Sequence, residues 1–298
     1  MNDSLEVLKK IYKPYKYTLL NKCTMLESTS GNIVVKKKGN VNIGELYSYL
    51  NSRGFTNYPK LIEDNRDDIN VFEYINDVDT PIDQKSSDLI NLISSLHNKT
   101  SFTKEVTEDK YKEIYENILA NILYKEKFYN DLIEASEDNV FPSPAQMLLL
   151  TNSFKIFESI EFCKKELEEW YSMVSNVKEE RVSLIHNNLK LDHYLRNVKD
   201  YLISWDKACI DTPILDLVNF YRSDMMKINF GPLLKKYLSN YSLNEHELKL
   251  FFILIVMPDL VDLNKSEFVN VKQIRTVLDY IFKTEELVRP YYSKEEKE

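Results

Sequence analysis

The sequence predicts an α+β fold with two lobes: a small N-terminal lobe with a β-sheet and one helix, and a larger, mostly helical C-terminal lobe. Strand-forming residues and turn residues dominate residues 1–76, whereas helical periodicity dominates residues 77–298. One stretch of the second part, residues 184–221, returns to short strands and a loop. We therefore place the lobe boundary after residue 76 and expect the chemistry of the C-terminal lobe in 184–221.

The N-terminal lobe begins with strands. Three segments have strand-forming composition: Tyr17–Cys23, Met25–Ser28 and Ile33–Val35. Turn-forming residues at positions 29–32 separate the last two, which predicts a hairpin. The third segment leads into Lys36. Because side chains alternate along a strand, Val34 and Lys36 are expected on one face of the sheet.

A helix and a last strand complete this lobe. Apolar residues at helical spacing predict a helix over Ile43–Leu50, and this helix carries Glu45. The segment Ile69–Ile75 predicts a strand that leads into the connection between the lobes. Its end, from Glu73 to Ile75, then lies beside any ligand held between the lobes.

Helices dominate the C-terminal lobe. The predicted segments are 86–99, 111–123 with a continuation over 128–135, 145–174, 232–238, 244–256 and 271–287. The third of these helices contains four aromatic residues, Phe154, Phe157, Trp170 and Tyr171, whose spacing predicts a core-facing side.

The stretch 184–221 has a specific order of elements. An apolar strand ending at Ile185 is followed by a loop that opens on His186, and a second short strand covers Tyr201–Ile203. Trp205 and Asp206 follow, and a turn from Pro213 leads into a helix.

Composition excludes several classes of protein. A net charge of −8 and a pI near 5.3 give no basic surface for nucleic acid. Three widely spaced cysteines indicate neither a disulfide framework nor a zinc site. The longest apolar run, 250–257, is too short to span a bilayer, so we expect a cytoplasmic protein. Five glycines are too few for a glycine-rich phosphate loop.

The motifs in 184–221 resemble those of the aminoglycoside phosphotransferase and choline kinase family, which includes a spore-coat kinase-like branch. That family has a catalytic loop of the form His-x-Asp-x-x-x-x-Asn and a metal-binding segment Ile-Asp-Trp/Phe-Asp/Glu. Here the first frame falls on His186, Asn188 and His193, and the second on 203–206. The resemblance implies a two-lobed protein-kinase-like fold, with ATP and Mg²⁺ as the cofactors of an active member.

The resemblance also assigns a role to each candidate residue. In the catalytic loop, Asn188 takes the position of the base and His186 orders the loop. The metal positions are His193, Ser204 and Asp206. The nucleotide positions are Lys36 for the phosphates, Glu45 as its ion-pair partner, and Glu73 and Ile75 beside the adenine. His97 and Asp216 match positions that pack and brace the catalytic loop.

The residues at the catalytic positions are altered together. Phosphoryl transfer in this family uses a carboxylate to accept the proton of the attacking hydroxyl, which the amide of Asn188 cannot do. Ser204 lacks a carboxylate for magnesium, and the imidazole of His193 suits other metals better. Asp192 and Asp206 are the two carboxylates that could substitute, although Asp192 also fits a simple turn residue.

Three functions remain open from the sequence. The first is a pseudokinase with an interaction or structural role, for which a spore-coat-like assembly is one setting, and with a protein as its partner. The second is an active ATP-dependent small-molecule phosphotransferase that uses Asp192 or Asp206. The third is a non-catalytic binder of cationic amines. ATP and Mg²⁺ are the expected cofactors if the nucleotide site is intact. The alternative is a protein that binds no cofactor.

Overall fold

The computed structural model describes residues 8, 10–20, 23–29, 31–62, 68–107 and 109–292. The chain divides into two compact units, each made from two stretches of sequence. The first contains 1–102 and 182–242, and the second contains 103–181 and 243–298. All candidate site residues belong to the first unit. The lobe boundary predicted after residue 76 falls within this unit and stays a prediction.

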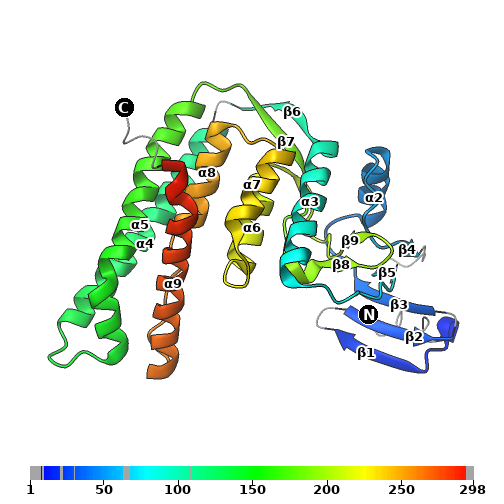
Figure 1. Ribbon diagram of the computed structural model, residues 1–298, viewed down its shortest axis with the longest axis horizontal. Coiled ribbons are helices and arrows are strands. Elements are labelled where there is room, and N and C mark those ends of the chain that lie inside the picture. The colour runs from blue at the N-terminus through cyan, green and yellow to red at the C-terminus, as the bar shows by residue number, and fades with distance from the viewer. Residues whose placement is uncertain are drawn as a thin grey trace. The chain divides into compact units, whose positions relative to one another are not determined.

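The first unit contains a five-stranded antiparallel sheet (Figure 1). Its strands are β1 (Lys16–Leu20), β2 (Cys23–Ser28), β3 (Gly31–Lys37), β4 (Leu61–Ile62) and β5 (Ile69–Glu73), in the order β1-β2-β3-β5-β4. The predicted hairpin is confirmed, since β2 pairs with β3 from Cys23–Lys36 to Ser28–Gly31. One residue of the predicted turn, position 30, lies outside the described residues.

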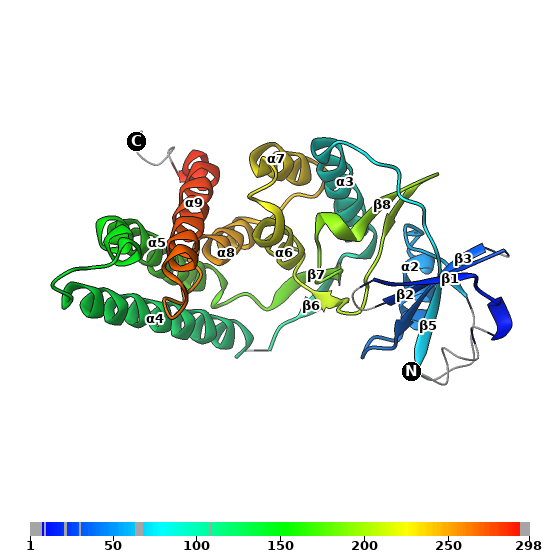
Figure 2. The same ribbon diagram turned by 90° about the horizontal axis from the view of Figure 1, so that it is seen from below.

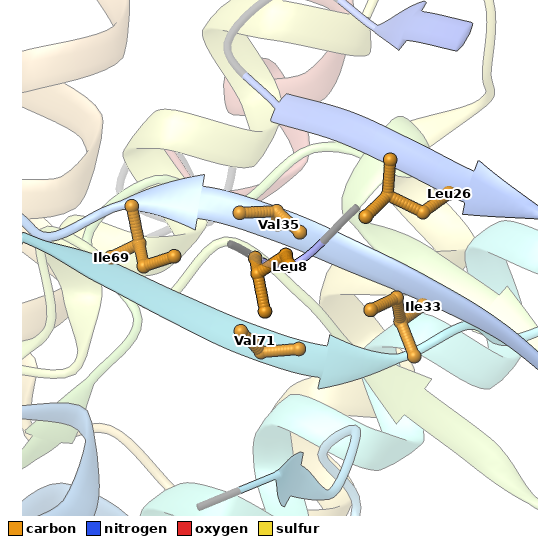
Figure 3. Close-up of a cluster of buried hydrophobic side chains, with 6 residues drawn as sticks. All are labelled: Leu8, Leu26, Ile33, Val35, Ile69 and Val71. Atoms are coloured by element: carbon orange, nitrogen blue, oxygen red, sulfur yellow. The ribbon is translucent and has the colours of Figure 1, made fainter. Parts of the chain in front are cut away.

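The two faces of this sheet have different roles. Ile33 and Val35 point to one face, where they join Leu26 and Val71 in a buried apolar cluster. Leu8 covers this cluster and is itself fully buried (Figure 3). The alternate residues of β3, which include Lys36, therefore point to the opposite face. The predicted alternation along β3 is confirmed.

Helix α2 (Ile43–Ser52) follows β3 and confirms the predicted helix. Asn42 caps its first turn by accepting a hydrogen bond from the Glu45 amide. The ring of Tyr47 stacks on Tyr58 with centroids 3.9 Å apart and lies 6.5 Å from the ring of Phe72 on β5. These contacts hold α2 on the face of the sheet that carries Phe72.

The remainder of the first unit is mixed. Its elements are α3 (Ile82–Thr100), the 3-10 helix η1 (Leu191–His193), β8 (Tyr194–Arg196), β9 (Asp200–Leu202), β10 (Cys209–Asp211), α6 (Ile214–Asp224) and α7 (Phe230–Asn240). β8 and β9 form a hairpin, and β10 pairs with the last residues of β7 (Glu179–Ile185). β6 (Phe102–Glu105) and β7 each span a boundary between the two units.

Buried His97 joins α3 to α6 and α7. Its Nδ1 lies 2.7 Å from the Tyr237 hydroxyl, and its Nε2 lies 3.2 Å from the Asp216 carboxylate. Both His97 and Asp216 are completely buried. The structural role predicted for His97 is therefore confirmed.

The second unit is helical. It consists of α4 (Lys110–Glu137), α5 (Pro144–Val174), α8 (Glu245–Val256) and α9 (Glu267–Tyr292), and α5 packs against the other three (Figure 2). The predicted segments 111–123 and 128–135 form one continuous helix. Trp170 is buried as predicted, but Phe154 is 54% exposed, so its assignment to the core was wrong.

The long helices of this unit are amphipathic rather than apolar throughout. Among the residues that the structure describes, no helix has the length and apolar character needed to cross a membrane.

Candidate functional site

The first unit contains a cavity of about 280 Å³ on the α2 face of the sheet. Its walls come from β3, α2, the end of β5 and the segment 203–206 that follows β9. Apolar side chains supply most of the lining, among them Val34, Phe72 and Ile203. Lys36 adds a cationic group, and Glu73, Asp77 and Asp206 add carboxylates. The topology thus brings together residues that are 170 positions apart in sequence.

The end of β5 provides one edge of this cavity. Glu73 and Ile75 both line it, and their place beside an adenine stays a prediction. The Tyr74 amide donates to the Asn32 carbonyl at 3.2 Å, and the Glu73 carboxylate accepts from the Lys60 amide at 2.8 Å. In contrast, the backbone of Ile75 has no hydrogen-bond partner among the described residues, so its donor and acceptor are available to a planar ligand.

Lys36 forms an ion pair with Asp206 within this cavity. Both side chains are partly buried, with exposed fractions of 19% and 29%. The sequence predicted Glu45 as the partner of Lys36, and this pairing is wrong. Glu45 is exposed, and its carboxylate instead accepts from the Asn42 side chain at 2.8 Å. Because Glu45 lies in the first turn of α2, it stabilises that helix end.

The loop after β7 is held by one buried carboxylate. Asp216 accepts hydrogen bonds from the backbone amides of His186 at 2.8 Å and Asn187 at 2.7 Å. Asn187 has a φ of 53°, in the left-handed region that side chains other than asparagine and aspartate rarely adopt. The bracing role predicted for Asp216 is thus confirmed, and it fixes the path of the loop that carries Asn188.

His186 is a buried scaffold residue. Its Nε2 lies 2.8 Å from the Ile203 carbonyl, and its ring meets Trp205 edge-on at 4.9 Å. A carbonyl can only accept, so Nε2 carries the proton and Nδ1 is the bare nitrogen. Nδ1 has no partner among the described residues. Burial lowers the pKa of His186, although Asp216 and the Ile203 carbonyl oppose this shift.

His193, which the sequence predicts as a metal ligand, is not among the residues that line the cavity, and one of its ring nitrogens is already engaged. Its Nδ1 lies 2.6 Å from the Asn188 carbonyl, so Nδ1 is the donor and Nε2 carries the lone pair. Burial lowers the pKa of His193, and the nearby Lys190 and Lys36 lower it further. The ring is therefore neutral near neutral pH. Its hydrogen bond to the Asn188 carbonyl connects η1 to the start of the loop.

Asp192 and Ser204 complete the predicted set. Asp192 is exposed on η1 and is not among the residues that line the cavity. Ser204 lines the cavity with a φ of 68°, a conformation that costs energy for a serine. The neighbouring Trp205 is buried and donates from Nε1 to the Leu202 carbonyl at 2.8 Å, which holds this strained turn in place.

The sequence motifs did not indicate three further residues that contribute to this cavity and to the loop around Asn188. Asp224 accepts from the Leu191 amide at 3.0 Å and from Lys227 at 2.8 Å, and so braces the far end of the loop. Burial alone would raise the pKa of Asp224, but hydrogen bonds from Lys227 and Ser223 lower it overall. Cys23 and Tyr47 line the cavity. No motif in the sequence marks these residues, because only the pairing of β2 with β3 and the packing of α2 bring them there.

Together, the antiparallel sheet with its single helix, the edge after β5, and the loop and strand around His186 and Asp206 define a protein-kinase-like fold of the aminoglycoside phosphotransferase type. The chain is similar over 94% of its length to an aminoglycoside phosphotransferase from Alicyclobacillus acidocaldarius, with a TM-score of 0.67, 10% identity and 92% of that chain covered.

A second similar structure is the AMP-bound spectinomycin phosphotransferase, with a TM-score of 0.60, 15% identity and coverage of 95% of this chain and 97% of that chain. The same enzyme with ADP and spectinomycin matches with a TM-score of 0.51 and 14% identity over 95% of this chain and 98% of that chain. No protein-family model matches the sequence, and no curated protein matches it significantly.

The donor groups around the cavity fit a nucleotide better than a metal ion. Apolar walls and the free backbone edge at Ile75 suit a base, and Lys36 suits phosphate. Magnesium in phosphoryl-transfer sites is held by one or two carboxylates together with phosphates and water. Among the predicted metal positions, only Asp206 supplies a carboxylate, and that carboxylate forms an ion pair with Lys36. Within the described part of the chain, no cluster of three or more His, Cys, Asp or Glu residues could hold a metal.

Proposed function

We propose that this protein is a pseudokinase: a kinase-like protein whose cavity binds an adenine nucleotide but does not transfer its phosphoryl group. The observation that carries the proposal is a mostly apolar cavity that contains Lys36, combined with a loop that has the amide of Asn188 at the position of the base. Lys36 and Ile75, the residues predicted beside the phosphates and the adenine, both line the cavity. Asn188, by contrast, has no group that accepts a proton at the position of the base.

Support for nucleotide binding comes from the cavity itself. Val34 and Ile203 come from two separate parts of the first unit and both line the cavity, as do residues at the end of β5. A cavity of about 280 Å³ with mostly apolar walls matches the smaller end of known ligand sites. The spectinomycin phosphotransferase of similar fold binds AMP and ADP, which is consistent with a nucleotide as the ligand.

Support for the absence of transfer comes from the loop. A general base must accept the hydroxyl proton within hydrogen-bond reach, and an amide does not do so. The nearest replacement in sequence, Asp192, is exposed and does not line the cavity. Asp206 does line it, but its carboxylate is bonded to Lys36. We infer an interaction or structural role that the bound nucleotide supports, with a spore-coat-like assembly as one possible setting.

The test is a thermal-shift titration with ATP and GTP, followed by a measurement of ATP consumption with aminoglycosides and choline as acceptors. We expect a rise in melting temperature with ATP and no turnover above a protein-free control. Turnover that Asp206→Ala abolishes would establish an active phosphotransferase instead. A rise with choline or aminoglycosides, but none with nucleotide, would favour a binder of cationic amines.

A matched pair of variants ties the thermal shift to the cavity. Val34→Phe adds a ring to the cavity wall and should abolish the ATP-dependent shift, because the base and the ring compete for the same space. Val198→Phe makes the same change at a site that is 95% exposed and should leave the shift intact. An equal response of both variants would locate the nucleotide elsewhere.

A further inference from the structure

We propose that the nucleotide binds in this cavity without a divalent cation, and that the Lys36 ammonium occupies the place beside Asp206 that the cation would take. This inference rests on the proposed function and specifies its cofactor requirement. It starts from the disagreement between the magnesium site that the fold type implies and the side chains present.

The first step concerns the available ligands. Of the three predicted metal positions, Ser204 offers a neutral hydroxyl on a strained turn, with a φ of 68°. His193 donates from Nδ1 to the Asn188 carbonyl, which leaves one imidazole nitrogen, a poor ligand for magnesium. Asp206 is the one carboxylate among the three. At these three positions, a hard dication that prefers several anionic oxygens therefore finds a single anionic protein ligand.

The second step concerns the state of that ligand. Asp206 is paired with Lys36, and both side chains are more than two-thirds buried. A dication at Asp206 would have to displace the ammonium and would then lie beside it. Repulsion between the two cations in a partly desolvated site opposes this arrangement. The Lys36–Asp206 pair thus competes directly with metal.

The third step concerns the phosphates. Without a metal, they need cationic partners from the protein, and a lysine beside phosphate is a strong charge-assisted donor. Lys36 can donate to phosphate and to Asp206 together, because an ammonium has three donors.

The experiment compares ATP binding in EDTA with ATP binding in Mg²⁺, by calorimetry and thermal shift. We expect binding in EDTA to be at least as tight as in Mg²⁺. Mn²⁺ provides an independent readout, since its electron paramagnetic resonance signal falls when it is bound. Protein added to Mn²⁺ and ATP should not lower the signal below that of Mn²⁺ and ATP alone.

Three variants make the test specific. Lys36→Met should weaken ATP binding in EDTA by about tenfold or more, because a charge-assisted donor is lost. Lys37→Met is the matched control: Lys37 is exposed, lies opposite Ile69 on the other face of the sheet, and should bind as the unaltered protein does. Asp206→Asn removes the competing carboxylate without removing Lys36, so binding in EDTA should persist.

The outcomes separate the two proposals. Binding that appears only with Mg²⁺ and is lost in Asp206→Asn would overturn the metal-free inference while leaving nucleotide binding intact. No binding with or without Mg²⁺ would overturn the proposed function itself. Should Lys36→Met fold poorly, as judged by its melting temperature without ligand, Lys36→Gln and the EDTA comparison on the unaltered protein still decide the question.

Discussion

At the scale of single residues, buried polar groups hold the shape of the loop around Asn188. Asp216 accepts from two consecutive backbone amides and lies beside the ring of His97. His186 meets the Ile203 carbonyl, and His193 meets the Asn188 carbonyl. These contacts fix the loop at several points on both sides of Asn188.

The bracing by Asp216 gives a first prediction. Asp216→Asn should lower the free energy of unfolding by about 2–4 kcal/mol, because hydrogen bonds to a charged acceptor are lost and a buried amide must face backbone donors. Asp192→Asn makes the same change at an exposed site and should cost less than about 0.5 kcal/mol. Urea denaturation followed by the emission of Trp205, with Trp170 replaced by phenylalanine in both variants, provides the measurement, and equal midpoints for the two variants would contradict the bracing role.

The buried histidine gives a second prediction, on pH. Burial lowers the pKa of His186, so between this value and the ordinary value of about 6.5 the native protein binds fewer protons than the unfolded chain. The contribution of His186 to the free energy of unfolding is therefore fully present above about pH 6.5. It is lost as the pH falls through the pKa that His186 has in the folded protein. The melting temperature should decrease between about pH 7 and about pH 5.

The variant His186→Gln keeps a donor for the Ile203 carbonyl but cannot be protonated, so its melting temperature should depend less steeply on pH. His246→Gln, in the second unit, controls for the loss of a histidine as such. If His186→Gln showed the same slope as the unaltered protein, the acid sensitivity would have another source, such as His193 or Asp224.

At the scale of elements, the sheet of the first unit separates structure from ligand contact. One face of β3 enters the apolar cluster with Leu26 and Val71, and the other lines the cavity. Packing in the apolar cluster and contact with a ligand therefore involve alternate residues of β3.

The apolar cluster gives a third prediction. Leu26→Ala should lower the free energy of unfolding by about 2–5 kcal/mol, since Leu26 is fully buried and its loss leaves a cavity. Leu19→Ala is the matched control on the adjacent strand β1, where Leu19 is 75% exposed, and should change stability by less than about 0.5 kcal/mol. Chemical denaturation read from Trp205 checks both values. If Leu19→Ala lowered the free energy of unfolding as much as Leu26→Ala, the side chain of Leu19 would have to be buried in solution, which would contradict its role as an exposed control.

The capping box of α5 gives a fourth prediction. Ser143 accepts from the Gln146 amide, and the Gln146 side chain accepts from the Ser143 amide at 2.8 Å. Ser143→Ala should therefore destabilise the second unit by about 1 kcal/mol. Ser172→Ala, at an exposed site inside the same helix, should have almost no effect. Unfolding followed by Trp170 emission distinguishes them, and a stable Ser143 variant would show that the box contributes little.

At the scale of the whole molecule, the two tryptophans report on different units. Trp205 lines the cavity of the first unit, whereas Trp170 is buried in the second unit against the ring of Tyr111 at 6.0 Å. Each unit therefore has its own fluorescent probe without any added label.

This arrangement gives a fifth prediction. If a nucleotide binds in the cavity, the variant Trp170→Phe should keep a nucleotide-dependent change in fluorescence, and Trp205→Phe should lose it. The measurement is a fluorescence titration with ATP of both variants. A change that persists in Trp205→Phe and disappears in Trp170→Phe would place the ligand in the second unit.

Much of the fold was predictable from the sequence. Periodicity predicted α2, α5 and α8 within a few residues, and alternation predicted the two faces of β3. Short strands such as β4 and β10 were not predicted as such, because their few residues carry no periodic signal and are held by pairing with β5 and β7. The exposure of Phe154 could not be predicted from the sequence either, because the spacing of apolar residues does not show which side of a long helix packs against other helices.

The sequence by itself determined which chemical groups stand at the motif positions: an amide at Asn188, a hydroxyl at Ser204 and an imidazole at His193. These identities are fixed by the covalent chain and limit the chemistry in any fold. Only the tertiary structure decided that Lys36 pairs with Asp206 and that the Glu45 carboxylate instead accepts from the side chain of Asn42. The physical reason is that ion pairing depends on distance in space, and the packing of β3 against the segment after β9 sets that distance.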